Sequence, residues 1–240
     1  MRSFRYLSLV STIWISSLHA ILPNLETVQT QTAVTLPSRH YHLDFRMYEN
    51  GGIYSRVAIG LLENFTIGLS SDIENALGQK NPRMNVPGII AKLKFTNGFG
   101  RFPILISAGY DSFYIGALGK ITDANSSSRM IYGPYFAITK PLFLSLGEPN
   151  LHWGIRYPIQ PIEKSEDIST YIAFDFPLGQ LVPMIEIDRI YFNSTRLDEV
   201  LFGAAARYSV TPNFALEFKV VSGPKTAANR ILGLQFMDTF

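Results

Sequence analysis

Two groups of residues in the sequence have types and spacings that could support chemistry. His40, His42 and Asp44 alternate with apolar residues, so a β-strand would place their side chains on one face, where they could bind a metal ion. A competent zinc site needs three or four convergent ligands. The simpler interpretation is a row of hydrogen-bonded polar side chains, and we predict no metal site.

The second group could support nucleophilic catalysis. His152 and Asp175 fall on consecutive predicted strands, and serines are plentiful, so a nucleophile and a base could be brought together. However, the sequence contains no Gly-x-Ser-x-Gly segment. Asp, His and Ser side chains also meet by chance in any polar interior. We therefore predict no catalytic residue and no cofactor, and keep a membrane-embedded lipid hydrolase as an alternative.

The elements that must position these residues are β-strands with two different faces. Between residues 40 and 47, Tyr41, Leu43, Phe45 and Met47 are apolar and the residues between them are polar or charged. Successive side chains of a strand point to opposite faces, so this strand has one apolar face and one charged face. The Glu-Asn-Gly-Gly segment that follows tolerates positive φ, which predicts a hairpin.

The same alternation recurs along the chain and predicts about twelve strands, with ten as the lower alternative. A phase slip near Arg189 indicates a β-bulge. Long connections mostly alternate with short turns, as in outer-membrane barrels, which have long outer loops and short periplasmic turns. We therefore predict an all-β fold, a transmembrane up-and-down antiparallel β-barrel. Its strands are expected at 40–47, 53–61, 65–72, 89–95, 104–111, 130–139, 151–157, 168–176, 182–191, 199–209, 213–221 and 229–237.

The N-terminus and the composition indicate an exported protein. Arg2 and Arg5, an apolar stretch at 7–15 and Ala20 predict a signal peptide at residues 1–20. Residues 21–38 are expected to form an N-terminal periplasmic or plug-like segment, and residues 39–240 the barrel. No apolar run reaches the roughly 18 residues of a membrane-spanning helix, so a helical membrane protein is excluded. The chain has no cysteine, which excludes zinc fingers, catalytic thiols and disulfide scaffolds.

The charges are balanced both along the chain and on the predicted inner face. Removing Arg2 and Arg5 with the signal peptide leaves 19 of the 21 basic residues against 19 acidic ones, which argues against a nucleic-acid-binding protein. Matched signs favour pairing across the lumen over a strongly ion-selective field. We also expect the long loop at 111–129 to fold inward and constrict the lumen. The predicted lumen-lining charges are Asp44, Arg46, Arg56, Asp72, Lys92, Lys94, Asp111, Arg156, Asp175, Glu186, Asp188, Arg207, Glu217 and Lys219.

Several short motifs suggest a known family. They include Thr-Leu-Pro at 35–37, Arg-Met-Tyr-Glu-Asn-Gly-Gly at 46–52, Asn-Pro-Arg at 81–83, Gly-Tyr-Asp-Ser at 109–112 and Leu-His-Trp-Gly at 151–154. Together they cover most of residues 33–157 and resemble the YjbH-like outer-membrane β-barrel family, which is largely uncharacterised and associated with exopolysaccharide. The resemblance implies a barrel in the outer membrane of a Gram-negative bacterium. It implies no catalytic residue.

The sequence therefore predicts a non-enzymatic outer-membrane barrel. We expect it to act as a narrow channel or as a structural component linked to envelope polysaccharide export. Its expected partners are outer-membrane lipid, polysaccharide and the barrel-assembly machinery, which would bind the C-terminal strand ending in Phe240; no nucleic acid is expected. A second alternative is a soluble lipocalin-like binding barrel, which would place apolar side chains inside and polar ones outside.

Overall fold

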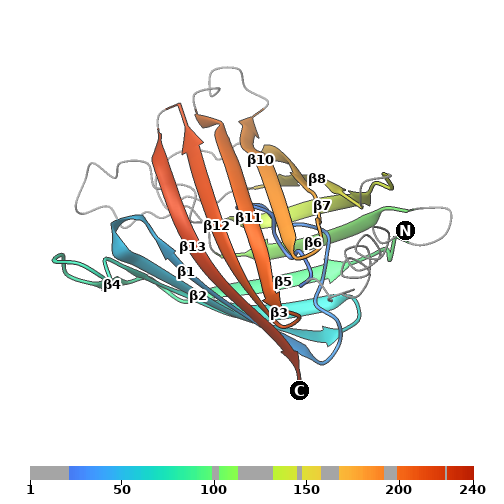
Figure 1. The fold of residues 1–240 in the computed structure, drawn as a ribbon, viewed down its shortest axis with the longest axis horizontal. Coiled ribbons are helices and arrows are strands. Elements are labelled where there is room, and N and C mark those ends of the chain that lie inside the picture. Colours follow the sequence, from blue (N-terminus) through green and yellow to red (C-terminus); the bar gives the residue numbers. More distant parts are fainter. Residues whose placement is uncertain are drawn as a thin grey trace, which may run out of the picture.

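The chain forms one closed ring of antiparallel strands (Figure 1). The computed structural model describes residues 22–98, 103–112, 132–144, 148–157, 168–191, 199–224 and 226–240. Each wall strand pairs with the wall strands before and after it in the sequence. β1 (His40–Tyr48) pairs with β13 (Thr226–Thr239), and β2 (Gly52–Leu62) pairs with β3 (Phe65–Glu74), so the ring closes.

Twelve strands make the wall, as the alternation predicted. The short β4 (Arg83–Met84) was not predicted. It pairs with the last residues of β3 and is not one of the wall strands. A 3-10 turn, η1 (Glu49–Gly51), connects β1 and β2, with positive φ at Asn50 and Gly51. The other wall strands are β5 (Gly88–Lys94), β6 (Leu105–Asp111), β7 (Gly133–Pro141), β8 (Asn150–Arg156), β9 (Ser169–Asp175), β10 (Leu181–Tyr191), β11 (Leu201–Thr211) and β12 (Phe214–Gly223).

Two local predictions were tested by the strand pairing. The predicted bulge in β10 is confirmed, because the register against β9 shifts between Ile187 and Ile190 and Arg189 has a φ of 57°. The predicted signal peptide at 1–20 and residues 113–129 of the predicted constricting loop at 111–129 lie outside the described residues. No described helix is long and apolar enough to cross a membrane.

The two faces of the wall differ in the way that the alternation predicts. Large apolar side chains point outward over the ring, among them Leu69 and Ile185, which are 63% and 62% exposed. Their strand neighbours Ser70 and Glu186 are buried. A soluble lipocalin-like barrel would have the opposite arrangement, so the structure excludes this alternative.

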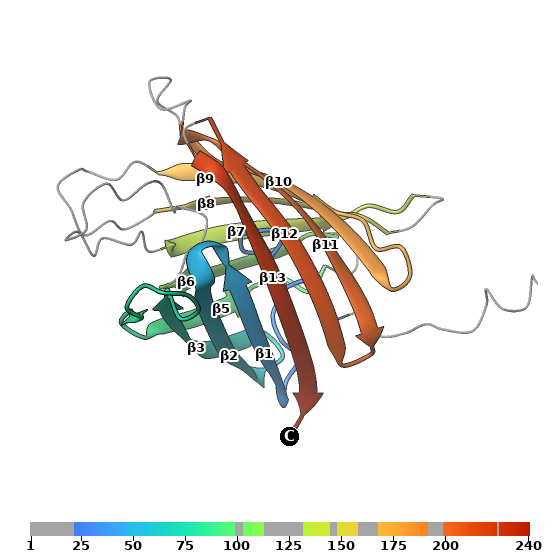
Figure 2. The ribbon, with the colours of Figure 1, turned by 60° about the vertical axis from the view of Figure 1, so that its left-hand side comes forward.

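The strands end at two different mouths (Figure 2). One end, which we call the short-turn mouth, carries the turns at 63–64, 176–180 and 212–213, the connections 95–104 and 142–149, and the C-terminal end of β13. The opposite end, the long-loop mouth, carries the connections 75–87, 112–132, 157–168 and 192–200 and two tight turns. This distribution mostly follows the predicted pattern of long outer loops and short periplasmic turns, with the connections 95–104 and 142–149 and the two tight turns as exceptions.

Candidate functional site

The predicted lumen-lining charges lie on the inner face of the wall. Thirteen of the fourteen are at most 5% exposed, and Lys94 is half-buried near the end of β5. A closed barrel whose apolar side chains point outward leaves only the lumen for these groups. The lumen is therefore densely charged, and the contacts described below show what fills it.

Residues 22–37, which we call the plug, run inside the ring of strands (Figure 1). Most of the plug is buried, and Val28, Thr32 and Leu36 have no exposed surface. It folds back on itself: Glu26 and Gln31 form an antiparallel bridge, and the Thr27 amide donates to the Thr30 carbonyl oxygen at 2.9 Å. The plug is thus a hairpin with its own backbone hydrogen bonds.

The tip of the hairpin is held by one wall carboxylate, that of Glu186 on β10. Its Oε2 accepts hydrogen bonds from the backbone amides of Val28, Gln29 and Thr30 at 3.0–3.1 Å. The hydroxyls of Thr27 and Thr30 donate to the same oxygen at 2.6 and 2.8 Å. Successive backbone amides that converge in a turn form a concave anion-binding nest. Here the anion that occupies the nest belongs to the barrel itself.

The Glu26 carboxylate of the plug lies among three buried cations of the wall. It forms ion pairs with Arg46 on β1, with Arg56 on β2 at 3.2 Å and with Lys219 on β12 at 3.9 Å. Each cation also pairs with a carboxylate of the wall, respectively Asp44, Asp111 and Glu217. A buried charge is costly unless it is paired, so these contacts make a charged interior compatible with burial.

Wall side chains also form hydrogen bonds with backbone groups of the plug. Lys92 Nζ donates to the Leu25 and Val34 carbonyl oxygens at 2.8 and 3.1 Å, and Lys219 Nζ donates to those of Thr27 and Val28 at 3.1 and 2.9 Å. The Gln31 amide donates to the Tyr132 hydroxyl, and the Tyr171 hydroxyl donates to the Gln31 carbonyl oxygen. Because buried backbone groups without partners are costly, these side chains specify the position of the plug.

Both ends of the hairpin lie at the short-turn mouth. At one end, the Asn24 side-chain amide donates to Asp175 at the end of β9, and Arg207 near the end of β11 donates to Asn24 at 2.8 Å. At the other end, the Arg39 amide donates to Gly60 near the end of β2, and the Phe240 amide donates to the Arg39 carbonyl oxygen.

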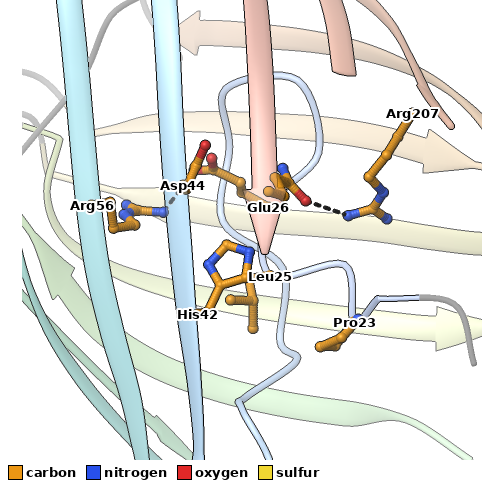
Figure 3. Close-up of a pocket in the computed structure, with 8 residues that line it drawn as sticks. Pro23, Leu25, Glu26, His42, Asp44, Arg56 and Arg207 are labelled. Carbon is orange, nitrogen blue, oxygen red and sulfur yellow. Dashed lines mark hydrogen bonds and ion pairs between the residues drawn. The ribbon is translucent and has the colours of Figure 1, made fainter. Parts of the chain in front are cut away.

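A small cavity lies between the plug and the wall near this mouth (Figure 3). Its volume is about 10 Å³, and its polar lining includes Arg56, which pairs with Glu26, and Arg207, which donates to Gln235 at 3.3 Å. Its lining residues are Pro23, Leu25, Glu26, His42, Asp44, Arg56, Arg207 and Gln235.

The residues that suggested chemistry have structural partners instead. His152 Nδ1 lies 2.9 Å from Thr139 Oγ1, and its Nε2 lies 2.8 Å from Asp175 Oδ2. Thr139, His152 and Asp175 are arranged like the nucleophile, base and acid of a hydrolase. However, the Thr139 hydroxyl oxygen is buried and accepts a hydrogen bond from the Ala33 amide of the plug at 2.9 Å. Among the described residues, no group of three or more His, Asp or Glu side chains could hold a metal ion.

Two close approaches of the plug were not predicted, because they depend on glycines that alternation alone does not mark. A Cβ atom at Gly60 would lie 2.0 Å from the Pro37 carbonyl oxygen, and one at Gly203 would lie 2.9 Å from Val28 Cγ1. The polar Glu26–Gln31 side chains were also missed as functional residues. The run of polar and small residues from 26 to 33, ahead of the first strand, was their sequence signal.

Comparisons with known proteins agree on the fold. No family model matches the sequence, and no curated protein matches it. A solved structure of the KdgM porin superposes with a TM-score of 0.52 at 14% identity, covering 82% of this chain and 98% of the porin. The chain has a porin-like fold. A KdgM porin complex with disordered oligogalacturonate gives a TM-score of 0.53 at 12% identity, with the same coverages. The outer membrane protein Omp33 of Acinetobacter baumannii covers 90% of this chain at 10% identity and a TM-score of 0.40.

Proposed function

We propose that the protein is a non-enzymatic barrel of the Gram-negative outer membrane that acts as a narrow channel closed by its own plug. The observation that carries this proposal is the pairing of an apolar outer face with a lumen filled by residues 22–37. The outer face suits lipid, because outer-membrane barrels expose a band of apolar side chains to the bilayer. The matched charges of the wall favour a channel of low ion selectivity when the plug is displaced.

Planar-bilayer recording tests the channel. We expect the full chain to be closed most of the time and the variant Glu26→Gln/Thr30→Val to show frequent conductance steps, because it weakens contacts to four charged wall residues, Arg46, Arg56, Lys219 and Glu186. Phe218→Leu, a change on the outward face, is the matched control and should behave like the unaltered chain. Absence of conductance in all three proteins would remove the channel from the proposal.

We further propose that the barrel is linked to envelope polysaccharide export. The resemblance of the motifs within residues 33–157 to the YjbH-like family supports this link, and the KdgM porin, a structural neighbour, has been solved with disordered oligogalacturonate. A deletion strain should secrete less exopolysaccharide, and the full chain should restore it. Unchanged secretion by the deletion strain would refute the link while leaving the channel proposal intact.

A further inference from the structure

We propose that the plug is a tethered ligand of the barrel, a hairpin that leaves and re-enters the lumen as one unit through the short-turn mouth, with Glu186 as the side chain that holds its tip. The proposal extends the closed-channel function but concerns the movement of the plug, which can be measured without any conductance. Three features of the structure carry it.

The first feature is that the backbone of the hairpin is hydrogen-bonded to itself and not to the backbone of the sheet. Its backbone hydrogen bonds run from Thr27 to Thr30 and from Thr32 to Leu25. Within the described residues, no backbone-to-backbone hydrogen bond joins residues 22–36 to a wall strand. Every hydrogen bond described between this part of the plug and the wall strands uses at least one side chain. Withdrawal therefore breaks no strand pairing.

The second feature is that both described limbs of the hairpin end at the short-turn mouth. The limb that leads to β1 lies beside the β2–β3 turn, where the Thr35 hydroxyl donates to the Glu63 carbonyl oxygen at 3.3 Å. The other limb lies beside the β9–β10 turn, where Asn24 contacts Asp175. Only the tip reaches toward the long-loop mouth. A loop that enters and leaves by one opening can move out without threading its end through the ring.

The third feature is the concentration of the tip's contacts on one charged atom. Five donors of residues 27–30 converge on Glu186 Oε2. Hydrogen bonds to an ionised acceptor are about twice as strong as neutral ones. Neutralising this single carboxylate weakens all five hydrogen bonds at once. Asp188 lies two residues further along β10 and pairs with Arg156 of the wall, so its neutralisation weakens a contact within the wall.

The test uses the full chain, which has no cysteine, so that one introduced thiol reports on the plug. Val28→Cys places the thiol at the buried tip, and Thr32→Cys is a second variant in case the first does not fold. A thiol reagent too large to cross the outer membrane is added to intact cells, where it reaches the outer surface. It is added in parallel to cells with an opened outer membrane, where it also reaches the periplasmic side.

We expect labelling only when the reagent reaches the periplasmic side, where short turns of such barrels lie. Adding Glu186→Gln should raise the labelling rate by roughly 10- to 100-fold, because a charged acceptor shared by five donors becomes neutral. The matched control Asp188→Asn should change it less than threefold. Equal labelling from both sides, no labelling of either thiol, or an equal effect of the two neutralisations would overturn the proposal.

A disulfide gives an independent measurement. A Cβ atom at position 203 would lie 3.0 Å from Val28 Cβ, so Val28→Cys/Gly203→Cys needs the two positions to separate by about 0.5–0.8 Å to reach disulfide geometry. Oxidation should protect both thiols and hold the plug inside even with Glu186→Gln, and reduction should restore labelling. If the oxidised protein with Glu186→Gln still exposes Thr32→Cys to the reagent, the plug does not move as one unit and the proposal fails. Neither measurement depends on conductance, so a failure of the proposed plug movement can be distinguished from a failure of the proposed channel function.

Discussion

Ile185 on β10 provides a sharp test of whether the apolar outer face of the wall contacts lipid. Its side chain is 62% exposed, and it lies near the middle of an 11-residue strand, between buried Met184 and Glu186. If lipid surrounds the barrel, Ile185→Arg places a charge near the centre of the bilayer. Leu181, at the start of the same strand and 41% exposed, provides a matched site closer to the short-turn mouth.

The magnitude follows from the geometry of the strand. Four residues at about 3.4 Å each separate the two sites by roughly 14 Å along the strand. At a tilt of about 40° this is roughly 10 Å along the bilayer normal. An arginine facing lipid costs about 2–4 kcal/mol at the midplane and about 0–1 kcal/mol near the interface. We therefore expect Ile185→Arg to lower the free energy of unfolding by about 2 kcal/mol more than Leu181→Arg does.

The assay is reversible urea unfolding in lipid vesicles, followed by the fluorescence of Trp153 on β8, which is itself partly exposed on the outer face. With a denaturant dependence of about 2 kcal/mol per molar, the two midpoints should differ by about 1 M. A surface substitution in a water-soluble protein usually changes stability by less than about 0.5 kcal/mol. Equal, small effects at both positions would refute the lipid-facing assignment.

Three further predictions concern the plug and the polar line beside it. Gly60→Ala should displace the limb of the plug next to β2 and raise the labelling rate of a cysteine at the tip at least several-fold. In the control Gly233→Ala, the added Cβ atom would have its nearest neighbour at 3.3 Å, so the labelling rate should be unchanged. Tyr171→Phe removes a buried 2.6 Å hydrogen bond to the plug and should cost about 1 kcal/mol in vesicle unfolding; an unchanged midpoint would contradict the described contact. His152→Asn should leave phospholipid turnover by purified protein unchanged, because Thr139, its neighbour on β7, is already hydrogen-bonded to the plug. A loss of turnover would favour the alternative of a lipid hydrolase.

The wall could be predicted from the sequence because each strand carries its own signal. In β1, strict alternation from His40 to Met47 fixes which side chains point outward, and a one-residue error would exchange the apolar and the charged faces. The bulge at Arg189 was also visible as a break in that alternation. β4 was missed because two residues, Arg83 and Met84, are too few to show a period.

The sequence suggested a separate N-terminal segment at 21–38 but not the contacts that hold residues 22–37. Its position depends on partners more than 100 residues away in the sequence, such as Glu186 for Thr27 and Tyr171 for Gln31. No local pattern encodes which wall carboxylate accepts the amides of a turn. The alternation predicts that the charges share one face, but it does not predict their pairing through Glu26, which needs the closed ring to bring β1, β2 and β12 around that residue.

The order in which the plug's partners are synthesised has a consequence for folding. Residues 22–37 precede every wall strand in the chain, yet the tip contacts Glu186 and Lys219, which come about 160 and 190 residues later. The ring itself closes by pairing the first strand with the last, a contact of the longest range and therefore slow to form. The plug is synthesised first, but it can reach its final position only after β10 and β12 have formed. Because its two limbs share one opening, it can enter a lumen that is already complete, and barrel closure need not be delayed by the piece that finally fills it.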